Sequence, residues 1–297
     1  MKPGARVVLT GASSGIGAEL ARVFAARGAR LAIAARRRER LEALADELGE
    51  PPALVFATDL SERGAAAELG REAEAALGGV DVLVNNAGGG VGGRIATVAD
   101  RDEAREAFEV NYWSPLALIG AVLPGMAERG SGVIVNVTSV AQVNTWPGFG
   151  AYAATKGALG VATETLRLEL IGTGVHVLEA IPGPVDTAVQ GETRLAPGID
   201  EMLDRVPLGD AREMAERIVR AIDRRSAHVI YPRRAAIAYH APSLARWDTR
   251  RAAARVARTI EPETRAALEG LVVRTGSLGD DLARQAREQW ERSRGRE

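Results

Sequence analysis

Cysteine is absent from the sequence, which excludes disulfides, thiolate catalysis, iron–sulfur clusters and cysteine-ligated zinc. Histidine occurs only three times in 297 residues, so we expect no metal site. Basic and acidic residues nearly balance, at 38 and 39, and such a chain has no overall field to attract nucleic acid. The sequence also lacks the apolar run typical of a membrane span or a secretory signal. These absences favour a cytoplasmic globular protein.

Some residue types are scarce enough to be informative where they occur. Only two of the 38 basic residues are lysines, Lys2 and Lys156, so arginine serves wherever a general cation suffices. Tyrosine occurs only four times. A lysine and a tyrosine that stand at a regular spacing are therefore candidates for a functional site.

What the sequence does contain is an alternation of short apolar runs with longer helical stretches, typical of βαβ units around a parallel sheet. We predict strands at residues 6–9, 31–34, 53–57, 80–84, 133–137, 175–181 and 228–231. Helices are predicted at 15–27, 37–48, 61–77, 102–129, 151–171 and 211–224. The pattern indicates an α/β fold, in which a doubly wound parallel sheet of about seven strands has helices on both faces.

Two further segments lie outside this alternation. Residues 190–210 form an unusually long connection, which suggests a lid. We predict one catalytic domain over residues 1–232 and a helical C-terminal extension over 233–297 that is not an independent domain. The first part of the extension is rich in arginine, but apolar and arginine side chains share one sector of its helix. We therefore expect a structural role for the extension rather than contact with a membrane surface.

A glycine-rich turn follows the first predicted strand and opens a helix. Glycines at three positions permit a tight turn, close approach of the backbone to a pyrophosphate, and close packing of helix on strand. This pattern is typical of a dinucleotide site, although a turn that caps a helix is the simpler alternative. The candidate cofactor-binding residues here are Gly11, Ser13, Ser14, Gly15, Ile16 and Gly17.

The end of the second predicted strand indicates which dinucleotide binds. Ala35 occupies the place where an acidic residue commonly holds the adenosine ribose. Arg36 and Arg37 follow, and guanidinium groups suit a 2′-phosphate. We therefore predict that NADP(H) is preferred, with NAD(H) as the alternative; the arginines could equally belong to the solvated start of a helix.

Polar or small residues also follow the next two predicted strands, where ligands bind in such sheets. Asp59 and Leu60 follow the third strand, and Asn86, Ala87 and Gly88 follow the fourth. Helix capping and ordinary turn chemistry are the alternatives for these positions.

The strongest chemical signal is Tyr152 with Lys156, because residues four apart share one face of a helix. A phenol is a poor base at neutral pH, but a neighbouring ammonium and an oxidised nicotinamide both favour its ionised form. Ser139 lies at the end of a predicted strand, and Asn111 lies on the preceding helix. These four residues form the candidate catalytic set; the alternative for Tyr152 alone is an aromatic side chain packed on the sheet.

Together these motifs resemble the short-chain dehydrogenase/reductase family, in its Tyr-x-x-x-Lys branch, over roughly residues 2–232. The resemblance implies a Rossmann-type fold in which Tyr152 transfers a proton and Ser139 steadies the substrate oxygen. It implies that Lys156 bonds the nicotinamide ribose and lowers the pKa of the tyrosine, and that Asn111 holds a water molecule. It also assigns nicotinamide contacts to Pro182, Gly183, Val185 and Thr187.

The sequence departs from the family pattern at several places. Gln142 stands where glycine is common, and Thr155 stands where serine is common. The run of residues 88–93 is unusually rich in glycine, which predicts a mobile loop beside the active site.

The resemblance implies an oxidoreductase that transfers hydride between NADP(H) and a secondary alcohol or ketone. An apolar small-molecule carbonyl or alcohol substrate is expected, because apolar residues surround the predicted opening: Trp146, Phe149, Val185, Leu195, Met202 and Leu203. A non-catalytic dinucleotide sensor or scaffold is one alternative, and an epimerase or dehydratase that retains its cofactor is another. Small residues on the helix of Tyr152, namely Gly157, Ala158, Gly160 and Val161, predict a homodimer or homotetramer.

Overall fold

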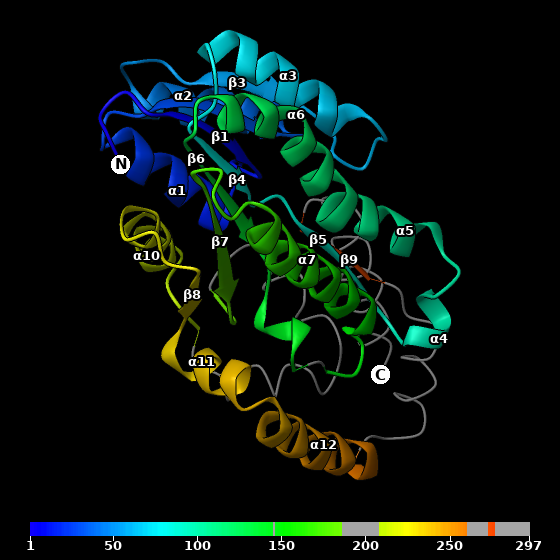
Figure 1. The fold of residues 1–297 in the computed structure, drawn as a ribbon. Helices are drawn as coiled ribbons and strands as arrows, with labels where there is room; N and C mark the ends of the chain where they lie inside the picture. Colours follow the sequence, from blue (N-terminus) through cyan, green and yellow to red (C-terminus); the bar gives the residue numbers. More distant parts are fainter. Residues whose placement is uncertain (145, 186–207, 260–272, 277–297) are drawn as a thin grey trace.

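The centre of the computed structural model, which describes residues 1–144, 146–185, 208–259 and 273–276, is a parallel sheet of seven strands (Figure 1). Its strands lie in the order β3-β2-β1-β4-β6-β7-β8. They are β1 (Arg6–Thr10), β2 (Arg30–Ala35), β3 (Leu54–Ala57), β4 (Val82–Asn85), β6 (Gly132–Val137), β7 (Val175–Pro182) and β8 (His228–Tyr231). The strand order reverses between β1 and β4, so the predicted doubly wound fold is confirmed.

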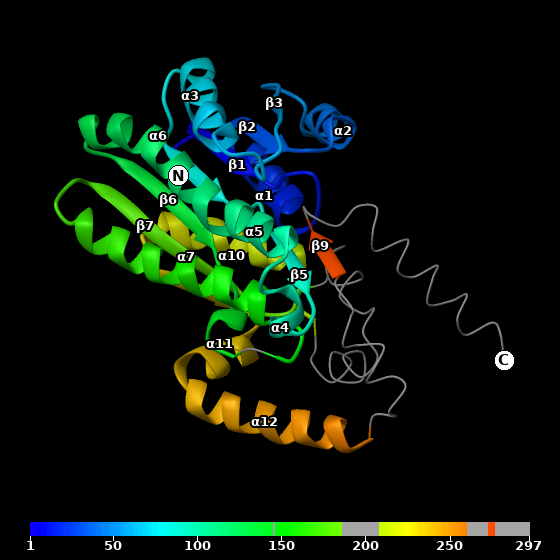
Figure 2. The same ribbon diagram turned by 90° about the vertical axis from the view of Figure 1, so that its right-hand side faces the viewer.

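Helices cover both faces of this sheet (Figure 2). One face carries α1 (Gly15–Ala25), α2 (Arg38–Leu48) and α10 (Ala211–Asp223), and the other carries α3 (Ala65–Leu77), α6 (Ser114–Glu128) and α7 (Gly150–Glu169). Successive residues of β1 show why the strands read as continuous apolar runs. Val7 packs in one core cluster and Val8 in the other, and both are fully buried. Strands covered on both faces need apolar residues at every position.

The region before α6 differs from the prediction of one helix over residues 102–129. It contains α4 (Ile95–Val98) and α5 (Asp102–Phe108), and a π-helical turn, η1 (Glu109–Trp113), joins α5 to α6. Single π-helical turns inside α-helices frequently occur at functional sites. Here the turn contains Asn111, one of the candidate catalytic residues.

The glycine-rich segment predicted as a mobile loop is instead a strand, β5 (Gly89–Gly92). It pairs antiparallel with β9 (Val273–Gly276) from the C-terminal extension, with Gly89 opposite Gly276. The prediction was wrong because glycine has a low strand propensity, so the sequence gives no strand signal here, and the partner strand lies far away in sequence.

The rest of the described extension is helical, as predicted, and comprises α11 (Arg233–His240) and α12 (Pro242–Thr259). Hydrogen bonds join α12 to the segment between β6 and α7. Arg246 Nε donates to the Val143 carbonyl at 2.9 Å, and Thr249 Oγ1 donates to Asn144 Oδ1 at 2.9 Å. Within the described ranges, no helix combines the length and apolar character that crossing a membrane requires.

Candidate functional site

The glycine-rich turn between β1 and α1 has the tight geometry that the sequence predicts. Gly11 and Gly15 adopt left-handed backbone angles, with φ of 69° and 54°. A Cβ atom at Gly17 would lie 2.1 Å from the Gly11 carbonyl oxygen, so only glycine fits there. Ser13 and Ser14 form the tip of the turn, and α1 then begins with Gly15 and Ile16. The backbone N–H groups at this helix end favour a phosphate.

Arg37 reaches this turn from the end of β2. Its Nη2 donates to Ser13 Oγ at 3.1 Å, and the same nitrogen lies 3.4 Å from Ser14 Oγ. Arg36 precedes it directly after Ala35, the last residue of β2. The structure therefore places the Arg37 guanidinium at the strand end where the sequence predicts the 2′-phosphate, and Arg36 precedes it in the chain.

The end of β4 is tied to the same turn. Asn86 Nδ2 donates to the Thr10 carbonyl at 3.0 Å, and the backbone N–H groups of Asn86 and Ala87 donate to Thr10 Oγ1. A Cβ at Gly11 would lie 2.8 Å from Ala87 Cα, so the two segments approach closely. Asn86 thus holds the glycine-rich turn in place, a positioning task that turn statistics alone do not predict.

Asp59 and Leu60 lie just after β3. Asp59 Oδ1 accepts hydrogen bonds from the backbone N–H and the hydroxyl of Ser61, at 2.9 and 2.7 Å. Leu60 is buried, and its carbonyl accepts a hydrogen bond from Ser114 Oγ at 2.8 Å. Asp59 therefore stabilises a turn and does not cap α3, which begins at Ala65 after the N-cap Gly64. Leu60 joins this strand end to α6.

Tyr152 and Lys156 share one face of α7. Lys156 is 3% exposed, its Nζ donates to the Val137 carbonyl at 2.9 Å, and the same Nζ lies 6.0 Å from the centre of the Tyr152 ring. Burial lowers the pKa of Lys156 to about 8. Ser139 caps a short 3-10 turn, η2 (Val140–Gln142), immediately after β6. The structure thus brings together the predicted tyrosine, lysine and serine.

The electrostatics of Tyr152 differ from the simple expectation of a lowered pKa. Burial raises the pKa of Tyr152, and the neighbouring Ser139 hydroxyl opposes that effect without reversing it. The phenol therefore keeps its proton at neutral pH. A protonated phenol beside a serine hydroxyl can act as a general acid.

Asn111 is completely buried and uses its side chain to hold neighbouring elements. Its Oδ1 accepts from the Gly89 N–H at 3.1 Å, and its Nδ2 donates to the Gly89 carbonyl and to Thr155 Oγ1. Thr155 Oγ1 in turn donates to the Tyr152 carbonyl at 2.7 Å. Asn111 thereby connects β5 to the helix that carries the tyrosine and the lysine.

Gly88 lies between two members of the candidate catalytic set. A Cβ at this position would lie 3.1 Å from Asn111 Oδ1 and 3.2 Å from Lys156 Nζ. A side chain here would therefore crowd both groups, and the glycine keeps the backbone close to Lys156.

The residues at the end of β7 are held by contacts with β8 and with Gly209. Gly183 N–H donates to the Tyr231 carbonyl at 2.7 Å, and Val185 is buried beside Gly209. Pro182 is the last residue of β7. Thr187 lies outside the described residues, as do positions 190–207 of the predicted lid and its Leu195, Met202 and Leu203.

The arrangement fits a nicotinamide dinucleotide. The glycine-rich turn, where added Cβ atoms would collide with backbone, lies at the reversal of strand order between β1 and β4. The pyrophosphate would rest at Gly11 to Gly17, and Lys156 with Tyr152 would reach the nicotinamide end.

Two residues of this region escaped the sequence predictions. The sequence marks Thr155 only as a departure from the family pattern, but its hydroxyl connects the Asn111 side chain to the Tyr152 carbonyl. Glu179 was not among the predicted site residues, although a single acidic residue in the apolar strand β7 indicates a buried charge. It is buried beside the segment that carries Ser139.

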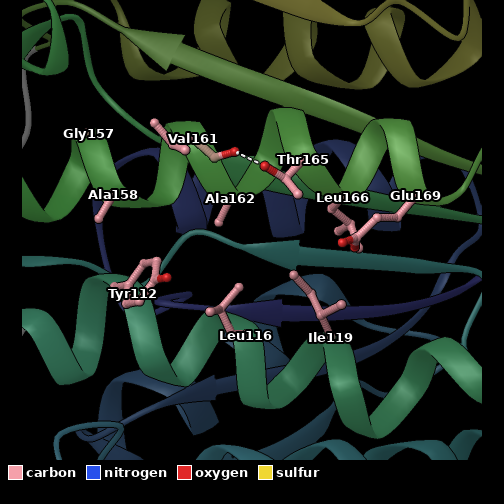
Figure 3. Close-up of a pocket in the computed structure, with 10 residues that line it drawn as sticks. All are labelled: Tyr112, Leu116, Ile119, Gly157, Ala158, Val161, Ala162, Thr165, Leu166 and Glu169. Carbon is pink, nitrogen blue, oxygen red and sulfur yellow. Dashed lines mark hydrogen bonds between the residues drawn. The ribbon is translucent and has the colours of Figure 1, made fainter.

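A separate pocket of about 560 Å³ lies between α7 and the helix formed by η1 and α6 (Figure 3). Neither Tyr152 nor Lys156 lines it, so it is distinct from the candidate active site. Side chains of η1, α6 and α7 line this pocket: Tyr112, Leu116, Ile119, Gly157, Ala158, Val161, Ala162, Thr165, Leu166 and Glu169. Gly160, which we predicted to lie on this surface, is absent from the lining and faces Gln142 instead.

A sequence comparison matches residues 5–197 to the family described as short chain dehydrogenase. A short chain dehydrogenase of Pseudocercospora fijiensis, MYCFIDRAFT_6125, is 42% identical over 189 residues, which cover 62% of this chain and 60% of that protein. Dehydrogenase/reductase SDR family member 7B of Danio rerio is 41% identical over 191 residues, or 61% of each chain. The chain thus spans about 60% of the length of these curated relatives.

Solved structures agree with the sequence comparison. A short-chain dehydrogenase from Streptomyces avermitilis is 30% identical with a TM-score of 0.72, covering 89% of this chain and 99% of that one. A short chain dehydrogenase/reductase from Burkholderia phymatum in complex with NAD is 29% identical with a TM-score of 0.70, covering 82% and 96% of the two chains.

Proposed function

The chain belongs to the short-chain dehydrogenase family, and from this premise we propose that it is an NADP(H)-dependent oxidoreductase acting on a secondary alcohol or ketone. The observation that carries the proposal is the group of Ser139, Tyr152 and Lys156, in which the serine and the lysine are buried. Lys156 is fixed by the Val137 carbonyl, and the Ser139 hydroxyl beside Tyr152 opposes the rise in the pKa of the phenol. A module that only binds a dinucleotide has no need of this proton-transfer set.

In the direction of ketone reduction, a nicotinamide held by the glycine-rich turn and Lys156 would supply the hydride for the carbonyl carbon. Tyr152 donates its phenolic proton to the carbonyl oxygen, which becomes the hydroxyl of the alcohol. Ser139 donates a hydrogen bond to the same oxygen and steadies the charge that develops there. Because burial raises the pKa of Tyr152, the phenol is protonated and ready to donate at neutral pH.

Lys156 acts on the phenolate that proton transfer leaves behind. Its ammonium lies 6.0 Å from the centre of the tyrosine ring and favours the negative charge. We assign it also to the nicotinamide ribose, because Gly88 leaves room beside its Nζ. Asn111 holds β5 and Thr155 in place, and we assign it the water molecule of the proton relay.

Replacing Tyr152 by Phe tests the proposed reaction. We expect carbonyl reduction to fall by about 10²- to 10⁴-fold, while NADPH binding stays within a few-fold of wild type. A panel of apolar ketones, assayed by NADPH consumption, supplies the substrates. Wild-type protein that binds NADPH and reduces none of them would favour a sensor or scaffold instead. Conversion of a substrate without net NADPH turnover would favour an epimerase or dehydratase.

The preference for NADP(H) over NAD(H) rests on Arg36 and Arg37. Arg37 lies against Ser13 and Ser14 at the glycine-rich turn. Ala35 stands where a carboxylate is common, so no negative charge at this position repels a 2′-phosphate. The relative from Burkholderia phymatum was solved with NAD, so the choice between the two dinucleotides needs its own test.

Equilibrium binding of NADPH and NADH at one salt concentration provides that test. Arg37→Ala should weaken NADPH binding by about tenfold or more, because hydrogen bonds to charged groups contribute about 1.5–3 kcal/mol, and should leave NADH binding unchanged. Arg38→Ala is the matched control, since Arg38 is exposed and pairs with Glu42 at 3.6 Å. Equal wild-type affinity for the two dinucleotides would refute the preference.

We propose further that the substrate is a small apolar carbonyl compound or alcohol, and that the chain assembles as a homodimer or homotetramer. Trp146 and Phe149, near the segment that carries Ser139, support an apolar substrate site. The pocket along α7 supports assembly, because Val161 in its lining is 71% exposed. Contact with nucleic acid or a membrane surface is not proposed, and location in the cytoplasm stays a prediction.

The C-terminal extension, residues 233–297, is proposed to be part of the catalytic unit and not an independent domain. The hydrogen bonds from Arg246 and Thr249 to the segment after Ser139 support this, as does the pairing of β9 with β5. Residues 1–232 form the rest of that unit.

A further inference from the structure

Glu179 is a buried carboxyl group that the proposed reaction does not use. It lies on β7 with 3% exposure, and its Oε1 accepts hydrogen bonds from Thr138 Oγ1 and from Gln142 Nε2, both at 2.8 Å. Thr138 directly precedes Ser139, and Gln142 lies three residues after it. One carboxylate oxygen is therefore hydrogen-bonded to a residue before the serine and to a residue after it. We call Thr138, Gln142 and Glu179 the Glu179 cluster.

The Glu179 cluster also packs directly against α7. A Cβ atom at Gly160 would lie 2.1 Å from Gln142 Oε1 and 3.4 Å from Glu179 Oε1. Gly160 lies one helical turn after Lys156, so the missing side chain leaves the space that the cluster fills. Gln142 stands where the family commonly has glycine, which makes this contact a feature of the present chain.

A third contact reaches the edge of the sheet. Glu179 Oε2 lies 3.5 Å from His228 Nε2, and the two residues are direct neighbours on β7 and β8. Isolated buried carboxylates are strongly unfavourable, whereas this one has two hydrogen-bond donors and an imidazole around it. The carboxyl group is thus held in one place by three elements: the segment after β6, α7 and β8.

We propose that Glu179 is a positioning residue for Ser139. It fixes Thr138 and Gln142, and through them it holds the serine hydroxyl at a set distance from Tyr152 on α7. The inference rests on the proposed function, since it takes Ser139 to be the group that binds the substrate oxygen. A misplacement of about 1 Å at a catalytic group can lower the rate about 10²-fold, so a fixed serine matters to turnover.

The test compares Glu179→Ala with Glu179→Gln. The alanine variant removes the shared acceptor, and we expect kcat for ketone reduction to fall by about 10- to 100-fold while the Kd for NADPH changes less than about twofold. The glutamine variant keeps an acceptor oxygen where Oε1 lies, and we expect it to retain most of the wild-type kcat. Thr138→Val and Gln142→Leu each remove one hydrogen-bond donor to Glu179, and each should lower kcat by a smaller factor than Glu179→Ala. If Glu179→Ala does not fold, these two variants test the proposal in its place.

His176→Ala is the matched control. His176 lies three residues earlier on β7, is partly buried, and bonds the Ser226 carbonyl at 2.9 Å, away from the Glu179 cluster. We expect His176→Ala to lose about as much stability as the variants of the Glu179 cluster and to keep the wild-type kcat. If the folded Thr138, Gln142 and Glu179 variants lose no more kcat than His176→Ala, the positioning role is refuted.

Hydrogen exchange separates this inference from the proposed function. The backbone N–H groups of Gln142, Val143 and Asn144 are bonded within the segment after Ser139. They should exchange faster in Glu179→Ala, and no faster in His176→Ala, whether or not the wild-type protein reduces ketones. Unchanged exchange would refute the positioning role, whereas faster exchange in a protein without any turnover would refute the proposed function alone.

Discussion

At the scale of single residues, Lys156 shows how burial sets a chemical property. The only other lysine is Lys2, and Lys156 lies in a buried position with its Nζ bonded to the Val137 carbonyl. Burial penalises the charged ammonium, which is why the pKa of Lys156 falls to about 8 from its usual value of about 10.5. A lysine loses its charge as the pH rises through its pKa, so this charge disappears within the range where enzymes are easily assayed.

We therefore expect kcat for ketone reduction to fall as the pH rises through about 8, because neutral Lys156 no longer stabilises the phenolate left by proton transfer. Initial rates at saturating NADPH and ketone between pH 6.5 and 9.5 measure this. Circular dichroism over the same range controls for unfolding.

The lowered pKa of Lys156 affects the free energy of unfolding in the opposite direction to kcat. The unfolded lysine keeps its proton up to a pH of about 10.4, so above pH 8 the unfolded state binds more protons than the folded state, and the contribution of Lys156 to stability rises with pH. A decline in rate that merely follows unfolding, or a flat rate profile up to pH 9.5, would contradict the assignment of Lys156.

The residues predictable from sequence are those whose signal is local. Tyr152 and Lys156 are four residues apart on one helix, and their rarity in this composition marks them without any structure. Glu179 works through Thr138 and Gln142, which lie 41 and 37 residues away in sequence. Thr155 likewise acts through Asn111, 44 residues earlier. Contacts of this kind depend on strand pairing and helix packing, which a spacing rule does not encode.

At the scale of elements, the seven strands of the main sheet begin and end within two residues of the predicted positions. Their apolar runs are buried on both faces, so composition alone marks them. The strand β5 was missed because Gly89–Gly92 has no β-branched pattern and gains its partner from the C-terminal extension. The π-helical turn η1 was missed because its sequence is as helical as its surroundings.

The contact between α12 and the segment after Ser139 gives a prediction at this scale. Thr249 is 7% exposed, and its hydroxyl donates to Asn144 Oδ1 at 2.9 Å. Thr249→Val keeps the shape but removes this donor, which should lower the free energy of unfolding by about 1 kcal/mol. We expect KM for the ketone to rise by about 2- to 10-fold at an unchanged Kd for NADPH, because the loosened segment borders the substrate site and not the dinucleotide turn.

Thr173→Val is the control for this variant. The Thr173 hydroxyl donates to the Leu170 carbonyl at 2.7 Å, between α7 and β7 and away from the site. A similar loss of stability with an unchanged KM should result. If the two variants change KM equally, α12 does not shape the substrate site.

At the scale of the whole molecule, the distribution of exposed apolar side chains is uneven. Both faces of the sheet are covered by helices, and the core divides into a cluster on each side. Large apolar side chains nevertheless stay exposed on η1, on α7 and just after α7, and one of them, Val161, lines the pocket in Figure 3. They are Trp113 at 54% exposure, Val161 at 71%, Leu168 at 61% and Ile171 at 76%. Exposed apolar side chains that lie close together are typical of an association surface.

We expect the same surface of two copies to meet across a two-fold axis, so that each pocket faces its equivalent. Sedimentation of wild-type protein at micromolar concentration should then give a mass that is a multiple of the 31.3 kDa chain. Val161→Arg places like charges opposite each other in such an interface and should shift the mass to that of one chain. Ile237→Arg, on α11 at 62% exposure, is the matched control and should leave the assembly intact. A wild-type monomer, or an unchanged assembly in Val161→Arg, would show that this surface of α7 is not where the copies meet.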